Sequence, residues 1–326
     1  MKKVFVATLW LGLVASCLSA AMVEPGWIDA RAVWFLHADV EAVLGLPLVK
    51  ECPIMKTDAP LPGRRWQAVT EKLGLDPRRD LLDVTVYATQ YEGDVGVMLI
   101  HLRSYDRGRM LAFLKERRPV FTASQHGDLP LYSWNMRYKR GHLEVTGAMP
   151  REDLLVIGAD AGHVRAALDV LAGKRPGLAP DAPLLRGMEA GALWMCQAID
   201  VPEDYRVTTW CPVLRQVKSA SVRWWNSGDR VWGRYLLHAV NAETASLVAQ
   251  AVEGLKAMFA LRFAGHPPVL ALLGGVSSKA DGAFYTFAWQ GTFEEIKAAA
   301  ILLHQMHPRK KRPDASPANP ADPQKP

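Results

Sequence analysis

Two stretches of the chain alternate apolar and polar positions in the way that β-hairpins do. Residues 83–103 (DVTVYATQYEGDVGVMLIHLR) and 219–240 (SASVRWWNSGDRVWGRYLLHAV) each contain two alternating runs around a Gly-Asp turn signal. A polar residue that can cap a helix follows each one, Ser104 after the first and Asn241 after the second. The pattern therefore predicts two antiparallel hairpins, each followed by a helix.

The elements around the two hairpins repeat in the same order. The run AVWFLHA at 32–38 is matched by ALWMCQA at 192–198, and each predicts a buried strand before its hairpin. A capped helix closes each half, beginning at Asp160 in the first and at the capping box Thr292-Phe-Glu-Glu295 in the second. Between hairpin and closing helix we expect strands at 129–135, 142–149 and 154–159, and at 269–276 and 283–289.

Strands grouped in hairpins and followed by helices predict an α+β protein built on antiparallel sheet that helices cover. We expect two repeated units, residues 27–175 and 190–307, related by a pseudo-two-fold axis. The glycine- and proline-rich stretch 173–183 separates them.

The first 21 residues have the three-part form of a secretory signal peptide. Lys2 and Lys3 precede an apolar run that is too short for a stable membrane span, and small residues follow it. Cleavage after Ala21 is the expected processing. The alternative is a lipobox, VASC, which would make Cys17 a lipidated N-terminus and attach the protein to a membrane. Both routes predict export to the periplasm, the cell envelope or the exterior.

Most of the positive charge lies outside the expected fold. Of the formal net charge of +6, the leader contributes two and residues 308–326 a net three, which leaves about +1 for the body. A body so close to neutral excludes nucleic-acid binding by the fold. The tail, with six prolines in 19 residues, is expected to be disordered. Its RKKR run is either a solvated end or a contact for acidic lipid or polysaccharide.

Three cysteines remain after the leader, in a compartment where thiols tend to pair. Cys52 and Cys211 each precede a proline at matching places in the two halves, which favours a disulfide between them. A local Cys196–Cys211 bridge and buried free thiols are the alternatives. None of the spacings has the paired CxxC form of a zinc or redox site.

The sequence contains no recognisable catalytic or metal-binding pattern. The GxSxG elbow, the P-loop, the Rossmann glycines and the HExxH helix are all absent. His101 and His238 occupy matching places and could face each other across the axis, but no acidic residue shares their strand face within two positions. His304 and His307 suit a helix C-terminus. We therefore expect no catalytic residue, metal or cofactor, and the sequence favours a protein that is not an enzyme.

One face of the second hairpin departs from its counterpart in the first. With Ser227 and Gly228 as the turn residues, Trp225 pairs with Arg230 and Arg223 with Trp232. We call this the Arg–Trp face, and its members are Arg223, Trp225, Arg230, Trp232 and Arg234. Interleaved indole and guanidinium groups suit three roles: a solvated surface held by cation–π contacts, a partner-protein interface, or a glycan-binding site.

Three segments resemble a group of secreted proteins from bacteria with elaborate envelopes. They are WFLHADVEA at 34–42, GLDPRRDLLDVTVY at 74–87 and HVRAALDVLAGKRPGLA at 163–179. The resemblance spans most of the mature chain and implies export and a duplicated α+β unit. That group has no established activity, so the resemblance implies no catalytic residue.

Together these observations predict an exported, non-enzymatic protein of the envelope or periplasm with an interaction or structural role. The alternative is a binding module for a lipid-like or glycan ligand. A hydrolase whose residues come together only in three dimensions is the third. The expected partners are an envelope protein, a lipid or a glycan.

Overall fold

The computed structural model describes residues 24–51, 70–91, 96–117, 121–138, 141–186, 191–205 and 215–306. The predicted leader with Cys17, the predicted disulfide partners Cys52 and Cys211, and the tail 308–326 lie outside these ranges.

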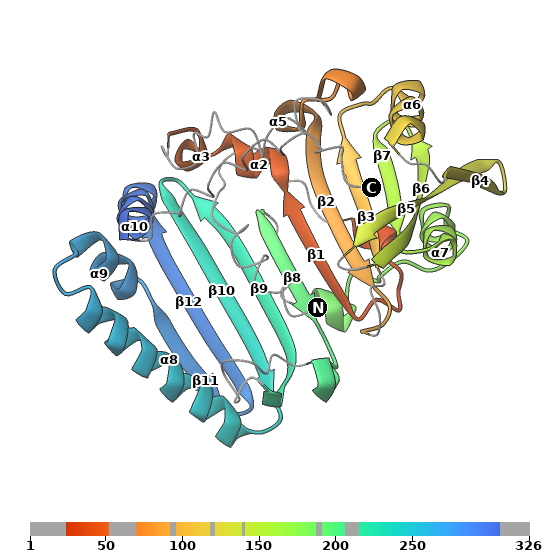
Figure 1. Cartoon of the computed structure of the whole chain (residues 1–326). Coiled ribbons are helices and arrows are strands. Elements are labelled where there is room, and N and C mark those ends of the chain that lie inside the picture. Colours follow the sequence, from red (N-terminus) through yellow and green to blue (C-terminus); the bar gives the residue numbers. More distant parts are fainter. Residues whose placement is uncertain are drawn as a thin grey trace, which may run out of the picture.

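Twelve strands form one continuous antiparallel sheet in this part of the chain (Figure 1). Their order is β11-β12-β10-β9-β8-β1-β2-β3-β7-β6-β5-β4. The strands of the first half are β1 (Trp34–Asp39), β2 (Leu81–Ala88), β3 (Val97–Leu102), β4 (Phe121–His126), β5 (Leu129–Tyr138), β6 (Gly141–Arg151) and β7 (Leu154–Gly158). Those of the second half are β8 (Trp194–Ala198), β9 (Val217–Ser227), β10 (Arg230–Ala239), β11 (Ser277–Asp281) and β12 (Phe284–Thr292). The predicted α+β class with antiparallel strands is confirmed.

Helices lie on the sheet and at its ends. They are α2 (Val40–Gly45), α3 (Pro47–Glu51), α5 (Pro77–Asp80), α6 (Arg107–Arg117), α7 (Ala161–Leu171), α8 (Ala242–Arg262), α9 (Pro267–Gly274) and α10 (Phe293–Met306). Short 3-10 turns occur at η1 (Pro25–Trp27), η2 (Pro183–Leu185) and η3 (Glu203–Tyr205). The longest helix, α8, runs beside the edge strand β11 (Figure 1).

The predicted helix caps are present with one exception. Asp39, Asp160 and Asn241 each accept a hydrogen bond from a backbone N–H three residues later, and Thr292 and Glu295 form the reciprocal capping box. The prediction that Ser104 caps the next helix is wrong. Asp106 accepts from the Arg109 N–H at 2.9 Å instead, and α6 begins at Arg107.

The prediction of a strand at 269–276 is also wrong, because most of this stretch belongs to α9. A short apolar run has no periodicity that separates a buried strand from a buried helix. Pro267 at the first turn favours the helix, since proline has no N–H to leave unpaired there. Val269 is buried with Ala299 of α10.

The helix layers lie on opposite faces of the two halves of the sheet. In the first half α7 packs Val164 and Leu168 against Phe35 of β1 and its neighbours. In the second half α8 packs Ala245 and Val248 beside Leu237 of β10. The strand register places Phe35 in one row with Leu236, so Leu237 points to the opposite face.

This arrangement is not the predicted pseudo-two-fold. β1 and β8 are antiparallel neighbours, so an axis that relates them runs perpendicular to the sheet and keeps equivalent helices on one face. The helices that close the two halves, α7 and α10, lie on opposite faces instead: α7 contacts Gly158, and α10 packs near Trp289 and Gly291 on the face that α8 covers.

A row of indoles crosses the second half of the sheet on that face. The register aligns Trp194, Trp224, Gly233 and Trp289 on four adjacent strands. Trp224 packs edge-on against Trp194 at 6.1 Å and against Trp289 at 5.3 Å between ring centroids. Trp289 lies directly over Gly233, where a side chain would overlap the indole.

We therefore expect Gly233→Ala to destabilise the fold by about 1–3 kcal/mol, because the added methyl forces the indole row apart. Urea unfolding followed by tryptophan fluorescence measures this change. Gly254→Ala on α8, where nothing lies within 4 Å of the new carbon, is the matched control and should stabilise by up to about 1 kcal/mol. Equal midpoints for the two variants would contradict the packing described above.

Candidate functional site

The Arg–Trp face is assembled in the structure with a register different from the predicted one. Gly228 and Asp229 form the turn, so Trp225 lies directly opposite Trp232, and Arg223 opposite Arg234. Gly228 has φ +59° and Asp229 is not left-handed, which matches a turn with glycine at its first central position. The turn moves by one residue, and all five side chains stay on one face of the sheet.

Stacking holds the centre of the Arg–Trp face. The indoles of Trp225 and Trp232 are 6.4 Å apart at their centroids and 7° from parallel, and the Arg234 guanidinium lies 5.6 Å from the Trp225 ring. Arg223, in contrast, is buried and donates to the Arg186 carbonyl at 3.1 Å. The accessible part of the face is therefore the exposed Arg230 and Arg234 with the half-buried Trp225 and Trp232.

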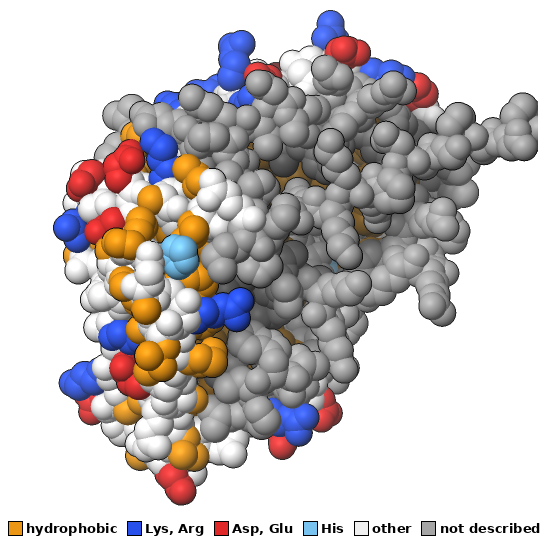
Figure 2. Space-filling view, turned by 60° about the vertical axis from the view of Figure 1, so that its left-hand side comes forward, with side chains coloured by type: hydrophobic (Ala, Val, Ile, Leu, Met, Phe, Trp, Pro, Cys, Tyr) orange, Lys and Arg blue, Asp and Glu red, His pale blue; other side chains and the backbone are white. Residues whose placement is uncertain are grey.

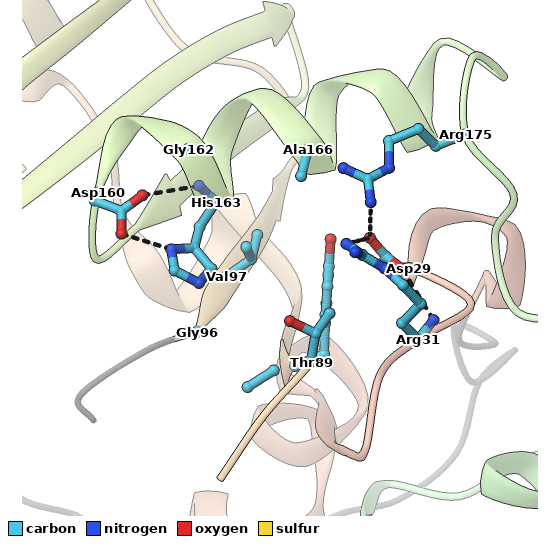
Figure 3. A pocket seen from close by; sticks show the side chains of 12 residues that line it. Asp29, Arg31, Thr89, Gly96, Val97, Asp160, Gly162, His163, Ala166 and Arg175 are labelled. Atoms are coloured by element: carbon cyan, nitrogen blue, oxygen red, sulfur yellow. Dashed lines mark hydrogen bonds and ion pairs between the residues drawn. The ribbon is translucent and has the colours of Figure 1, made fainter. Parts of the chain in front are cut away.

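A cavity of about 230 Å³ lies where the end of β2, the start of β3 and the first turn of α7 meet (Figure 3). On one side Asp29 accepts hydrogen bonds from the backbone N–H, Nε and a terminal nitrogen of Arg31 at 2.9–3.0 Å. Arg175 adds an ion pair at 3.5 Å. On the other side Asp160 pairs with His163 Nδ1 at 2.7 Å.

The charges around this cavity are stabilised by one another. Burial alone would raise the pKa of Asp29, but the hydrogen bonds and charge of Arg31, with Arg175, outweigh it and hold that pKa below its ordinary value. Tyr87, also on the lining, has its pKa raised by burial, so its hydroxyl stays protonated. The arrangement ties Asp29 to the segment after α7 and suits a structural role.

A second hollow, of about 180 Å³, lies between His37 and His101 on the same sheet face. His101 Nδ1 lies 2.8 Å from Asp83, its partner across the β2–β3 ladder, and Nε2 lies 3.6 Å from Asp153. No acidic residue lies within two positions of His101 on its own strand, and both carboxylates come from other segments of the chain. His37 Nδ1 lies 2.9 Å from the Thr85 hydroxyl.

His101 and His238 do not face each other. Four strands separate β3 from β10 in the sheet, and His238 stacks on Phe284 at 4.5 Å. Within the described ranges, no group of three or more His, Cys, Asp or Glu side chains could hold a metal ion.

Cys196 is a free thiol, so the alternative bridge to Cys211 is not formed. Burial raises the pKa of the Cys196 thiol to about 12, which makes it a poor nucleophile. The preferred Cys52–Cys211 bridge involves residues outside the described ranges and stays a prediction.

The feature that sequence reasoning missed is an exposed apolar surface on α8. Figure 2 shows hydrophobic side chains gathered along this helix. We call it the α8 patch, and its members are Leu247, Leu255, Met258, Phe259 and Leu261, exposed by 42–80%. Apolar residues lie all around α8, so the pattern of the sequence could not show that only one side is covered. No helix in the described ranges is both long and apolar enough to cross a membrane.

Comparisons with known proteins give a structural likeness only. No family model matches the chain, and neither does any curated protein. TP0453, an envelope-associated protein of Treponema pallidum, is similar in structure. Its crystal form III has a TM-score of 0.48 at 10% identity, covering 86% of this chain and 98% of that one. Crystal form IV has a TM-score of 0.48 at 8% identity, covering 86% and 97%.

Asp29 gives a test of the pairing around the first cavity. Because its pKa is lowered by folding, its contribution is present above about pH 4 and is lost as the pH falls through the folded pKa. We expect Asp29→Asn to cost about 1–2 kcal/mol at pH 7, a value reduced for the exposure of Arg31, and much less at pH 3.

Urea midpoints of the two proteins at pH 7 and pH 3 measure this difference. Asp281→Asn removes an exposed ion pair with Lys279 and is the control, expected to change stability by less than about 0.5 kcal/mol at either pH. A cost for Asp29→Asn that stays constant with pH would show that the carboxylate charge plays no part.

Proposed function

We propose that this protein is an exported, non-enzymatic interaction protein of the cell envelope, and that the α8 patch is the surface that binds a partner protein. The pattern of residues 1–21, which predicts a secretory leader, supports export. The observation that carries the interaction is the patch itself, since the sheet covers only one side of α8.

Five large apolar side chains on one helix are costly to leave in water. Each buried Å² of apolar surface is worth about 25 cal/mol, so the patch gains free energy when a partner covers it. Its composition fits the core of a protein interface, where Met and Phe are enriched and charged residues are depleted.

A protein surface suits the patch better than an anionic lipid surface. The exposed charged residues of α8 are Glu243, Glu253 and Arg262, so acidic groups outnumber basic ones. Helices that lie on membranes usually carry lysine and arginine along their polar face. Lys256 is half-buried and donates to the Val276 carbonyl at 3.0 Å, which turns its charge toward the fold.

The strand order also supports descent of the two halves from one duplicated unit. Read outward from the centre, the order is β1-β2-β3-β7 on one side and β8-β9-β10-β12 on the other. A capped helix follows the last strand of each series, α7 at Asp160 and α10 at Thr292.

The Arg–Trp face supports a second candidate function, the binding of a glycan. The parallel indoles of Trp225 and Trp232, with Arg234 beside them, offer a flat apolar surface next to positive charge. Sugar rings stack on such surfaces, and an acidic glycan would also pair with the exposed Arg230 and Arg234.

The α8 patch is tested by photo-crosslinking in cells of the source bacterium. A benzophenone amino acid at Met258 should give a protein adduct, because the patch is covered in the cell. The same amino acid at Leu303 of α10, also exposed (44%) but outside the patch, is the control and should give little. Adding Leu261→Gln to the Met258 probe should lower the adduct yield severalfold. Adducts with lipid alone would contradict the proposed function.

The glycan candidate predicts that Trp225→Ala abolishes retention on envelope polysaccharide while the thermal midpoint changes little, because Trp225 is half-buried. Trp232→Ala should also lower stability, since its Nε1 is buried. Retention of both variants on an affinity column, with melting curves measured alongside, separates the two effects. Undiminished retention of Trp225→Ala would remove this candidate.

A further inference from the structure

We propose that the cavity at the first turn of α7 binds a small carboxylate of single negative charge, and that Arg175 and Arg31 hold its carboxylate group. We call this space of about 230 Å³ the α7 cavity. It lies in the first half of the sheet, whereas α8 lies beside the second half (Figure 1). The proposal therefore adds a ligand site that does not depend on the α8 patch.

The Arg175 guanidinium is the charged group that the fold leaves without a full partner. Its side chain is only 33% exposed, and one terminal nitrogen lies 3.5 Å from an oxygen of Asp29. A hydrogen bond between a guanidinium and a carboxylate is shorter, at about 2.7–2.9 Å. Within the described ranges the side-chain N–H donors of Arg175 make no hydrogen bond. A positive charge that is mostly covered in this way favours an anion that accepts from it.

Asp29 does not fill this role, because Arg31 already occupies its carboxylate. The Nε and a terminal nitrogen of Arg31 donate to the two oxygens of Asp29 at 3.0 and 2.9 Å, and the Arg31 backbone N–H adds a third bond at 2.9 Å. Two guanidinium groups and one carboxylate leave a net positive charge at this end of the cavity. A second carboxylate, supplied by a ligand, would balance it.

Backbone contacts fix this end of the cavity before any ligand arrives. Asp29 pairs with Gly177 in an isolated antiparallel bridge. The Arg175 N–H donates to the Asp169 carbonyl of α7 at 3.1 Å, which holds the residue against the end of that helix. A site formed in advance lowers the cost of ordering side chains when a ligand binds. The Arg31 side chain is 62% exposed, so this end is also reachable from water.

The walls between the two ends suit the rest of a short-chain acid. Figure 3 shows Asp160 and His163 on one side of the α7 cavity and the two arginines on the other. Val97 and Ala166 between them offer apolar carbon to the alkyl chain of a ligand. The half-buried Thr89 makes no side-chain hydrogen bond in the part of the chain that the structure describes, so its hydroxyl can donate to a ligand oxygen.

The volume limits the size of the ligand. Pockets that hold drug-sized molecules usually measure about 300–1,000 Å³. The α7 cavity is smaller, at about 230 Å³, and therefore suits an acid of a few carbon atoms.

Asp160 limits the charge of the ligand. Burial alone would raise the pKa of Asp160, but the hydrogen bonds and charge of His163 outweigh it and hold that pKa below its ordinary value, so the carboxyl is ionised at pH 7. A ligand with a second negative group would place that group toward Asp160 and be repelled. One negative charge therefore matches the positive end without meeting the negative one.

Inorganic phosphate fits the cavity less well than a carboxylate. Phosphate usually binds where the N–H groups of a helix N-terminus are available. At α7 the Asp160 side chain already accepts from the His163 N–H at 2.9 Å, and its negative charge opposes a second anion at that place. The guanidinium end is thus the part of the cavity that can hold an anion.

Calorimetric titration of the chain without residues 1–21 with sodium butyrate, at pH 7 and constant ionic strength, tests the proposal. The expected result is saturable binding to one site. Arg175→Gln should weaken it about tenfold or more, because it removes the unmatched charge and leaves the Asp29–Arg31 pair in place. Arg165→Gln makes the same change at an exposed α7 residue outside the cavity and should leave the affinity unchanged.

A second variant fills the cavity and keeps both guanidinium groups. Ala166→Leu should abolish butyrate binding, because the larger side chain occupies the space of the alkyl chain. Melting curves of each variant identify those that fold, and only these enter the comparison.

Succinate, with the same number of carbon atoms and a second carboxylate, tests the role of Asp160. The parent chain should bind succinate several times more weakly than butyrate. Asp160→Asn should reduce this difference, and it keeps the helix cap because asparagine caps as well as aspartate does. A difference that stays the same in Asp160→Asn would overturn the limit to one negative charge.

Absence of butyrate binding, or equal affinity of the parent and Arg175→Gln, would overturn the site. Phosphate binding in place of butyrate would overturn the carboxylate class. None of these results bears on the α8 patch, which the Met258 crosslinking experiment tests separately.

Discussion

The fold depends on the pairing of β1 with β8. Five residue pairs, from Trp34–Ala198 to Ala38–Trp194, are the connection that makes two groups of strands into one sheet. Met195 of β8 and Phe35 of β1, on the two sides of this seam, are buried in the same hydrophobic core. The Tyr91 hydroxyl donates to the Ile199 carbonyl at 2.6 Å and lies 3.1 Å from the Val33 carbonyl, so it bridges the two halves where their strands meet.

A shared sheet leaves each half with one face that its own helices do not cover. α7 covers one face of the first half, and α8, α9 and α10 pack on the opposite face of the second. α8 lies at the outer limit of this layer, beside β10, β11 and β12, with no further helix beyond it in the described part of the chain (Figure 1). The position of α8 at the margin, more than its composition, is what leaves its apolar side in contact with water.

Local signals in the sequence predicted local structure well. The hairpins, the caps at Asp39, Asp160 and Asn241, and the antiparallel α+β class all follow from residues close together in the chain. The candidate sites could not be predicted in this way, because the residues that form each of them come from distant segments of the chain. Asp29, Tyr87, Asp160 and Arg175 line one cavity, yet no two of them belong to one motif. The sheet face that each helix covers depends on tertiary packing, and an apolar run such as 267–274 does not indicate which face that is.

The half-buried thiol of Cys196 is a chemical probe of the seam between the two halves of the sheet. It lies on β8 directly opposite Leu36 of β1, in the middle of the connection. In the closed state its high pKa leaves almost no thiolate for an alkylating reagent to attack. Opening of the seam would return this pKa toward its ordinary value, so an increase in the alkylation rate reports separation of the two halves of the sheet.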